Sequence, residues 1–195
     1  MVLTLLGIVQ AFALELLWTF VAAEDALVTF NLEGVFLGLQ SLSIFLAILG
    51  VWLVYASAVT RFVWVPSFLE LVLPFWVGLI QFLLIELMGV KDFPIWLLLT
   101  AILFATLHWI GQTTMLKARR DPENASFFDQ TSPATWRDFL SVYLITFGML
   151  LGGGLAWALG FSLTAKVGVM IAIIVVLFSQ LRQMEIWWTR SVRDE

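Results

Sequence analysis

Five polar side chains interrupt the long apolar runs of this sequence, and they are the groups most able to carry chemistry. Glu15 lies ~5 Å from the centre of the first run at 1.5 Å rise per residue. His108, in the fourth run, comes at a similar depth on the other side of the bilayer midplane. Gln112 follows His108 by four residues, so both share one helical face. The other two, Gln10 and Gln81, lie close to the centres of their runs.

Glu15 and His108 could form a titratable pair inside the membrane. Charged groups in hydrocarbon cost several kcal/mol and usually face a protein interior or a water-filled cavity. A contact between the two side chains, direct or through water, would offset part of that cost and suit proton or cation handling. The structural alternative is a neutral, hydrogen-bonded Glu15 carboxyl and a neutral His108 that donates to a backbone carbonyl.

The elements that must position these groups are transmembrane helices. The chain has 195 residues, of which 62% are hydrophobic and 12% are charged, and its mean hydropathy is +1.00. Six apolar runs are each near the ~20 residues that a membrane-crossing helix needs. We therefore predict an all-α polytopic protein in which residues 1–195 form a single transmembrane domain. The predicted spans are 1–22, 35–57, 67–89, 94–116, 138–160 and 164–186.

The basic residues predict the orientation of these spans. Eight of the ten fall on one side of the six-span reading, and only Lys91 and Lys166 fall on the other. Lys/Arg excess marks the cytoplasmic side, so both termini are expected in the cytoplasm and the protein in the plasma (inner) membrane. Asn124 begins a glycosylation sequon, Asn-Ala-Ser, on the same cytoplasmic side. A glycan attached there would overturn this orientation.

Small residues recur along the fifth span and predict close helix packing. They are spaced every four residues, as in small-xxx-small motifs, and the sixth span carries a matching pair. We expect a tight hairpin of the spans 138–160 and 164–186. A subunit interface, or a close approach to lipid or a cofactor, are the alternatives. The residues are Gly148, Gly152, Ala156 and Gly160 on the fifth span, and Gly168 and Ala172 on the sixth.

Several chemistries have no support in the sequence. The chain has no cysteine and one histidine, which is too few for a multi-histidine metal site or two axial haem ligands. The net charge of −4 and the absence of a basic patch with interleaved aromatics argue against nucleic-acid binding. No phosphate-binding loop, zinc-protease or nucleophile-elbow motif occurs. We predict no metal and no cofactor.

Three functions remain open at this point. The first is a small channel or transporter for an ion, a proton or a small polar solute, with a polar path near Glu15, Gln10, Gln81, His108 and Gln112. The second is a non-transporting subunit or scaffold that binds partner helices, lipid or a pigment- or quinone-like cofactor. A membrane enzyme comes third, because one glutamate and one histidine define no reaction. Besides the lipid bilayer, the expected partners are further copies of the chain or another membrane protein.

Overall fold

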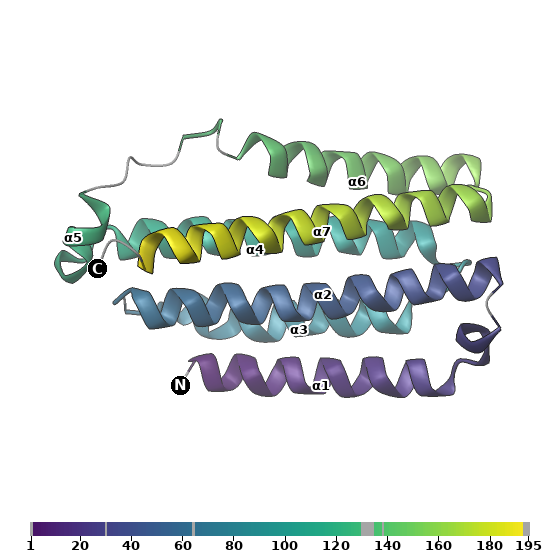
Figure 1. Ribbon diagram of the computed structural model, residues 1–195, viewed down its shortest axis with the longest axis horizontal. Helices are drawn as coiled ribbons and strands as arrows, with labels where there is room; N and C mark the ends of the chain where they lie inside the picture. The colour runs from purple at the N-terminus through teal and green to yellow at the C-terminus, as the bar shows by residue number, and fades with distance from the viewer. Residues whose placement is uncertain (1, 30, 64, 130–134, 138, 193–195) are drawn as a thin grey trace.

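The computed structural model shows six long helices, with a longer connection between α4 and α6 that contains η2 and α5 (Figure 1). It describes residues 2–29, 31–63, 65–129, 135–137 and 139–192, with backbone alone for residue 2 and residues 186–192. No strand occurs among these residues. The long helices are α1 (Val2–Ala23), α2 (Leu32–Arg61), α3 (Phe68–Glu86), α4 (Phe93–Ala118), α6 (Leu140–Leu159) and α7 (Leu163–Val192). The short ones are η1 (Asp25–Val28), η2 (Pro122–Asn124) and α5 (Ala125–Phe128).

All six long helices are long and apolar enough to cross a membrane. This confirms the predicted all-α, six-span class and makes the chain an integral membrane protein. Helices α2 and α7 each have 30 residues and exceed their predicted spans. At 1.5 Å per residue they extend about 45 Å, beyond the ~30 Å hydrocarbon core. Their ends therefore reach into the interfacial regions.

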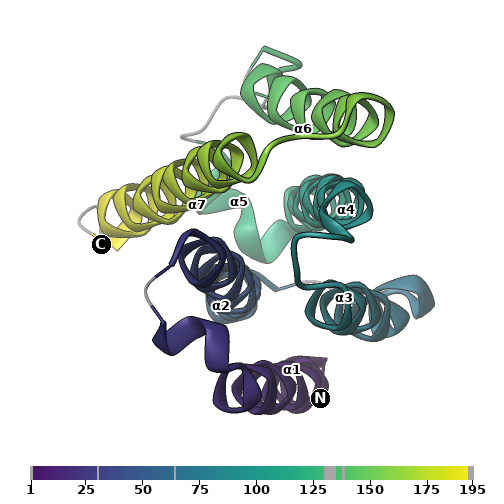
Figure 2. The same cartoon turned by 90° about the vertical axis from the view of Figure 1, so that its right-hand side faces the viewer.

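The helices are stacked in four layers, best seen along the bundle axis (Figure 2). Helix α1 packs on α2 and α3, α3 packs on α4, α2 packs on α7, and α4 packs on α6. Helices α1 and α6 therefore lie at opposite margins. The outer face of each is not covered by any other helix in the described part of the chain.

The alternation of the helices gathers most basic residues at one end of the bundle. The start of α1 and the end of α7 lie at the same end as α5 (Figure 1), which we call the α5 end; the opposite end is the η1 end. Arg61, Lys117 and Arg119 lie at the α5 end, whereas Lys91 and Lys166 lie at the η1 end. Two residues of the eight-residue basic group, the Arg190 side chain and Arg193, fall outside the described residues.

The small residues that recur along α6, here called the glycine stripe, pack against a different helix from the one predicted. Helix α6 packs along α4, and α7 packs along α2, so the expected tight hairpin of α6 on α7 does not form. A Cβ built on Gly153 would lie 2.8 Å from Leu98 Cδ2 and 3.2 Å from the Pro94 backbone oxygen. The absent side chain thus lets α4 approach α6. The physical reason for the difference is that leucines of α4, not residues of α7, fill the groove that the glycines leave.

The individual stripe residues have unequal roles. A Cβ on Gly152 would meet Leu97 of α4 at 3.4 Å, and Ala156 is buried. Gly160 ends α6 with a φ of +68°, a conformation that favours glycine. The remaining three, Gly148, Gly168 and Ala172, are exposed.

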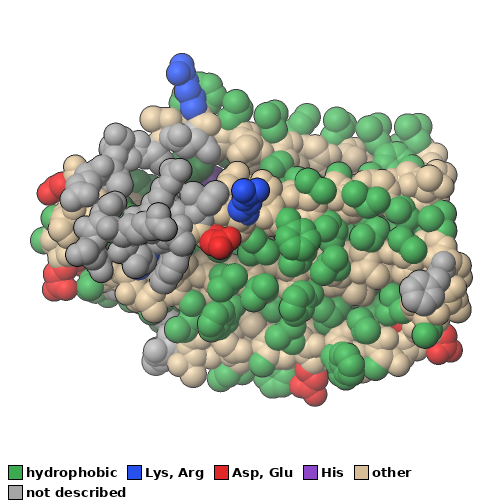
Figure 3. Space-filling view, in the orientation of Figure 1, with side chains coloured by type: hydrophobic (Ala, Val, Ile, Leu, Met, Phe, Trp, Pro, Cys, Tyr) green, Lys and Arg blue, Asp and Glu red, His purple; other side chains and the backbone are tan. Residues whose placement is uncertain are grey.

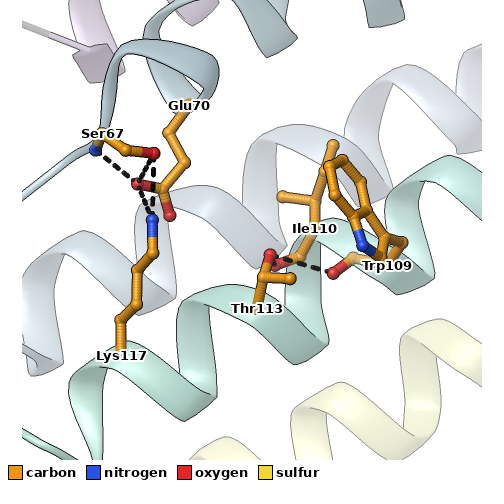
Figure 4. A network of polar contacts seen from close by, with 6 residues as sticks. All are labelled: Ser67, Glu70, Trp109, Ile110, Thr113 and Lys117. Atoms are coloured by element: carbon orange, nitrogen blue, oxygen red, sulfur yellow. Dashed lines mark hydrogen bonds and ion pairs between the residues drawn. The ribbon is translucent and has the colours of Figure 1, made fainter.

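A buried carboxylate ties α3 to α4 at the α5 end (Figure 4). The Ser67 backbone N–H and hydroxyl donate to Glu70 Oε2, at 2.7 and 3.0 Å, as a capping box that starts α3. Lys117 Nζ of α4 lies 2.7 Å from the same oxygen. One turn earlier on α4, the Thr113 hydroxyl donates back to the carbonyls of Trp109 and Ile110. Glu70 therefore fixes both a helix start and a helix pair.

The sequon asparagine also has a structural task. Asn124 is 5% exposed, and its side-chain amide donates to the carbonyls of Val63 and Ala118 at 2.7 and 2.8 Å. Its Oδ1 accepts from the Val63 N–H at 3.0 Å. A glycan would replace one of the two N–H hydrogens of this amide, remove one of these hydrogen bonds and have to fit at a buried side chain. The sequon is therefore a poor reporter of orientation, because the fold itself opposes its modification.

Candidate functional site

A long cavity lies between α2, α4, α6 and α7. Its volume is about 730 Å³, within the range of small-molecule sites. Along α4 its lining runs from Trp96 to Arg119, about 35 Å at 1.5 Å per residue. A volume of this size over such a length describes a narrow slot. The slot suits one extended chain better than a compact solute.

Most of the slot is apolar. The apolar side chains along it are mainly leucine, isoleucine, valine, methionine and phenylalanine, from α2, α4, α6, α7 and α5, with Leu84 from α3. The two hydroxyls toward the η1 end are already committed, since Ser43 donates to the Leu39 carbonyl and Thr100 to the Trp96 carbonyl. The principal apolar lining residues are Leu46, Val51, Leu103, Leu107, Met149, Ile173, Leu177 and Leu181.

The polar lining collects in the half of the slot nearer the α5 end. His108 and Gln112 of α4 contact each other, with 2.7 Å between His108 Nε2 and Gln112 Nε2. As placed, the amide donates, so His108 Nε2 accepts and the neutral ring carries its proton on Nδ1. The ring is held by Phe139 and Tyr143, whose centroids lie 4.8 and 6.0 Å away in edge-to-face contacts. This pairing confirms the shared face that their spacing predicts.

His108 and Gln112 also line a second, smaller cavity of about 310 Å³ between α4 and α6. Tyr143, Thr146 and Phe147 of α6 contribute to it. The two polar side chains therefore stand between two spaces. A ligand group in either space would meet an imidazole and an amide.

The mouth of the slot at the α5 end carries a positive charge. Arg119 is the single charged residue among the described residues that line the slot, and no acidic side chain lines it there. The Arg119 guanidinium lies 4.7 Å from the Phe128 ring centroid, a cation–π distance. Gln180 of α7 adds a further polar group near this end. The described lining of the mouth thus carries a basic side chain and an amide.

The two glutamines predicted for the polar path bond to each other instead. Gln10 Nε2 donates to Gln81 Oε1 at 2.9 Å, and Gln81 Nε2 donates to Gln10 Oε1 at 3.1 Å. Both side chains are buried, at 3% and 0% exposure. The reciprocal pair joins α1 to α3 and is closed to solvent. It acts as interhelical polar packing.

Glu15 lies apart from all of these groups. Its side chain is exposed on α1, which packs on α2 and α3, whereas His108 lies on α4 against α6. The structure therefore does not bring Glu15 to His108. The five residues of the predicted path fall into three places: the Gln10–Gln81 pair, the His108–Gln112 pair, and Glu15 alone.

Comparisons with protein-family models, curated proteins and solved structures found no match to this chain. The site must be read from its own residues.

Sequence reasoning missed the slot because it is defined by space between apolar side chains. Arg119 is one of the basic residues that predict the orientation, and Trp96, at the other end of the slot, is buried at 1% exposure against Phe93. One available signal was Gly111, a glycine three residues after His108 and next to Gln112. A Cβ there would meet nothing within 4 Å, so Gly111 faces open space in the slot.

Proposed function

We propose that this integral membrane protein binds one long-chain anionic amphiphile in the slot between α2, α4, α6 and α7. The observation that carries the proposal is the shape and polarity of the slot. It is narrow, it follows about 35 Å of α4, and its one charged lining residue in the described chain is Arg119 at the α5 end. Such sites are mostly apolar with a few placed polar groups.

Each part of the slot has a role in this proposal. The leucines and isoleucines of α2, α4 and α7 hold the hydrocarbon chain. Arg119 at the mouth attracts a carboxylate or phosphate headgroup, because charge-assisted hydrogen bonds from arginine are stronger than neutral ones. The free groups of the His108–Gln112 pair offer hydrogen bonds to an oxygen farther along the ligand.

This proposal takes up the expected binding subunit rather than the expected ion, proton or small-solute channel. A path for such solutes needs polar groups that follow one another through the bilayer. Gln10 and Gln81 satisfy each other, and Glu15 lies on another face, so these groups give such a path no support. We further propose, from the charge of the α5 end, that this end and both termini face the cytoplasm.

A matched pair of glycine substitutions tests the proposal. Gly111 and Gly154 are both helical glycines with nothing within 4 Å of an added Cβ, but only Gly111 lines the slot. Gly111→Leu should lower the amount of amphiphile that co-purifies, measured by mass spectrometry of organic extracts, by about tenfold. Gly154→Leu, on the exposed surface of α6, should leave it unchanged.

Charge selectivity is tested separately by Arg119→Gln. In binding titrations with fluorescent acyl probes, this variant should lose the preference for an anionic over a neutral headgroup and still bind the chain. Equal amounts of bound amphiphile in wild-type protein, Gly111→Leu and Gly154→Leu would contradict the proposed site.

A further inference from the structure

Glu15 occupies an unusual place for a carboxyl group. It lies about 4 Å from the midpoint of α1 at 1.5 Å per residue, and its side chain is exposed. Among the residues that the structure describes, none donates a hydrogen bond to its carboxyl oxygens. In Figure 3 the lower margin, formed by α1, is covered mostly by hydrophobic side chains. Glu15 is the single acidic residue of α1.

The exposed residues around Glu15 form a regular seam. They follow one another at intervals of four and three residues, the heptad spacing that keeps side chains on one face of a helix that packs against another helix. Ile8 and Trp18 of this seam are 51% and 71% exposed, so no described helix covers it. The seam consists of Thr4, Ile8, Ala11, Glu15, Trp18 and Ala22.

We propose that this seam pairs with the same seam of a second copy of the chain, so that the two Glu15 carboxyl groups meet and hydrogen-bond to each other. Two copies inserted in the same orientation place every seam residue opposite its own equivalent at the same depth. The two-fold arrangement is the commonest symmetry of soluble homo-oligomers, and the same self-complementarity applies here. A polar residue at such a position fixes the register of a helix pair.

The chemistry of Glu15 favours a copy of this chain over the lipid that would otherwise surround it. A neutral carboxyl group both donates and accepts, so two of them, or two that share one proton, satisfy each other. In lipid each would lack a partner, at a cost of several kcal/mol. The Gln10–Gln81 pair shows that this chain already joins two of its helices by a reciprocal bond between like side chains. The described Lys and Arg side chains lie toward helix ends or in connections, so the interface has no cation of its own at this depth.

Cysteine cross-linking locates the interface, because the chain contains no cysteine. Single Ala11→Cys protein in native membranes should form a disulfide-linked dimer on mild oxidation. Phe12→Cys is the matched control, since Phe12 is exposed on α1 and lies about 100° around the helix from Ala11, at the flank of the seam. Efficient cross-linking at Phe12 and not at Ala11 would place the contact elsewhere and overturn the proposal.

Substitutions of Glu15 test the chemistry in purified full-length protein, by single-molecule photobleaching in liposomes at decreasing protein density. Glu15→Leu should weaken dimerisation about tenfold. Glu15→Gln should keep it, because an amide also donates and accepts. Should Glu15→Leu fail to fold, Ala11→Trp provides a second variant that blocks the approach of the helices and leaves Glu15 in place. A wild-type protein that stays monomeric at all densities, or dimers that Glu15→Leu leaves unchanged, would overturn the proposal.

Discussion

The two margins of this bundle solve the problem of polar groups in a membrane in opposite ways. Where α1 meets α3, Gln10 and Gln81 each donate to and accept from the other, and the backbones come close together. Where α4 meets α6 and α7, His108 and Gln112 bond to each other but still line open space. Side-chain amides at similar depth can therefore either join two packed helices or form part of a binding site. What separates the two cases is the volume beside them.

Glycine shows the same contrast. Gly78 of α3 lies where an added Cβ would collide with Val9 Cγ1 of α1. Gly111 of α4 has nothing within 4 Å in the same test. One glycine is required by the close approach of two helices, and the other leaves room that no protein atom fills. Substitutions at these two positions therefore test whether α1 and α3 are in close contact and whether the space beside Gly111 is open.

The largest effect is expected at the closed margin. Gly78→Leu should lower the free energy of unfolding by about 3 kcal/mol, because the added side chain must push α1 away from α3 and valine is stiff at χ1. Steric trapping in bicelles measures this quantity. Gly154→Leu on the exposed face of α6 is the control for the change in helix propensity. A stability loss no greater than that of the control would show that α1 and α3 are not in close contact.

The next effect concerns the amide pair. Gln81→Leu should cost about 2 kcal/mol, because the Gln10 amide is left buried without a partner. The double variant Gln10→Leu with Gln81→Leu should recover most of that loss, since both buried polar groups are then removed. The same unfolding measurement compares the three proteins. Additive losses in the double variant would mean that the two amides do not interact.

More of the fold than of the site could be predicted from the sequence. The six spans follow from apolar runs and charge spacing, and the His108–Gln112 contact follows from four-residue spacing, because both depend on residues near each other in the chain. The Gln10–Gln81 bond could not be predicted in this way, because the two residues are 71 positions apart and meet only where α1 packs on α3. The slot was harder still to predict from the sequence. It depends on α6 packing against α4 instead of α7, and no single residue encodes that choice.

A smaller effect is expected where α3 and α4 are tied at the α5 end. Lys117→Met leaves Glu70, which is 6% exposed, without its ion-pair partner. Removing one partner of a buried pair costs several kcal/mol, but the Lys117 side chain is 37% exposed, so screening by water reduces the expected loss to about 1 kcal/mol. Adding Glu70→Gln should restore part of this stability. A loss in the single variant that the second substitution makes worse would assign Glu70 to the capping box alone.

The smallest effect on stability, and the most informative, is expected at the open margin. Gly111→Leu places a side chain in empty space, so the unfolding free energy of ligand-free protein should differ from that of Gly154→Leu, which has the same change in helix propensity, by less than about 0.5 kcal/mol. A ligand that binds only the folded state stabilises it by RT ln(1 + [L]/Kd), about 2.7 kcal/mol at a hundredfold excess over Kd. Wild-type protein should therefore gain stability from an anionic acyl amphiphile, whereas Gly111→Leu should gain little. Equal gains in both would place the ligand outside the slot, and a large loss in ligand-free Gly111→Leu would mean that the slot is closed and this margin is packed like the other.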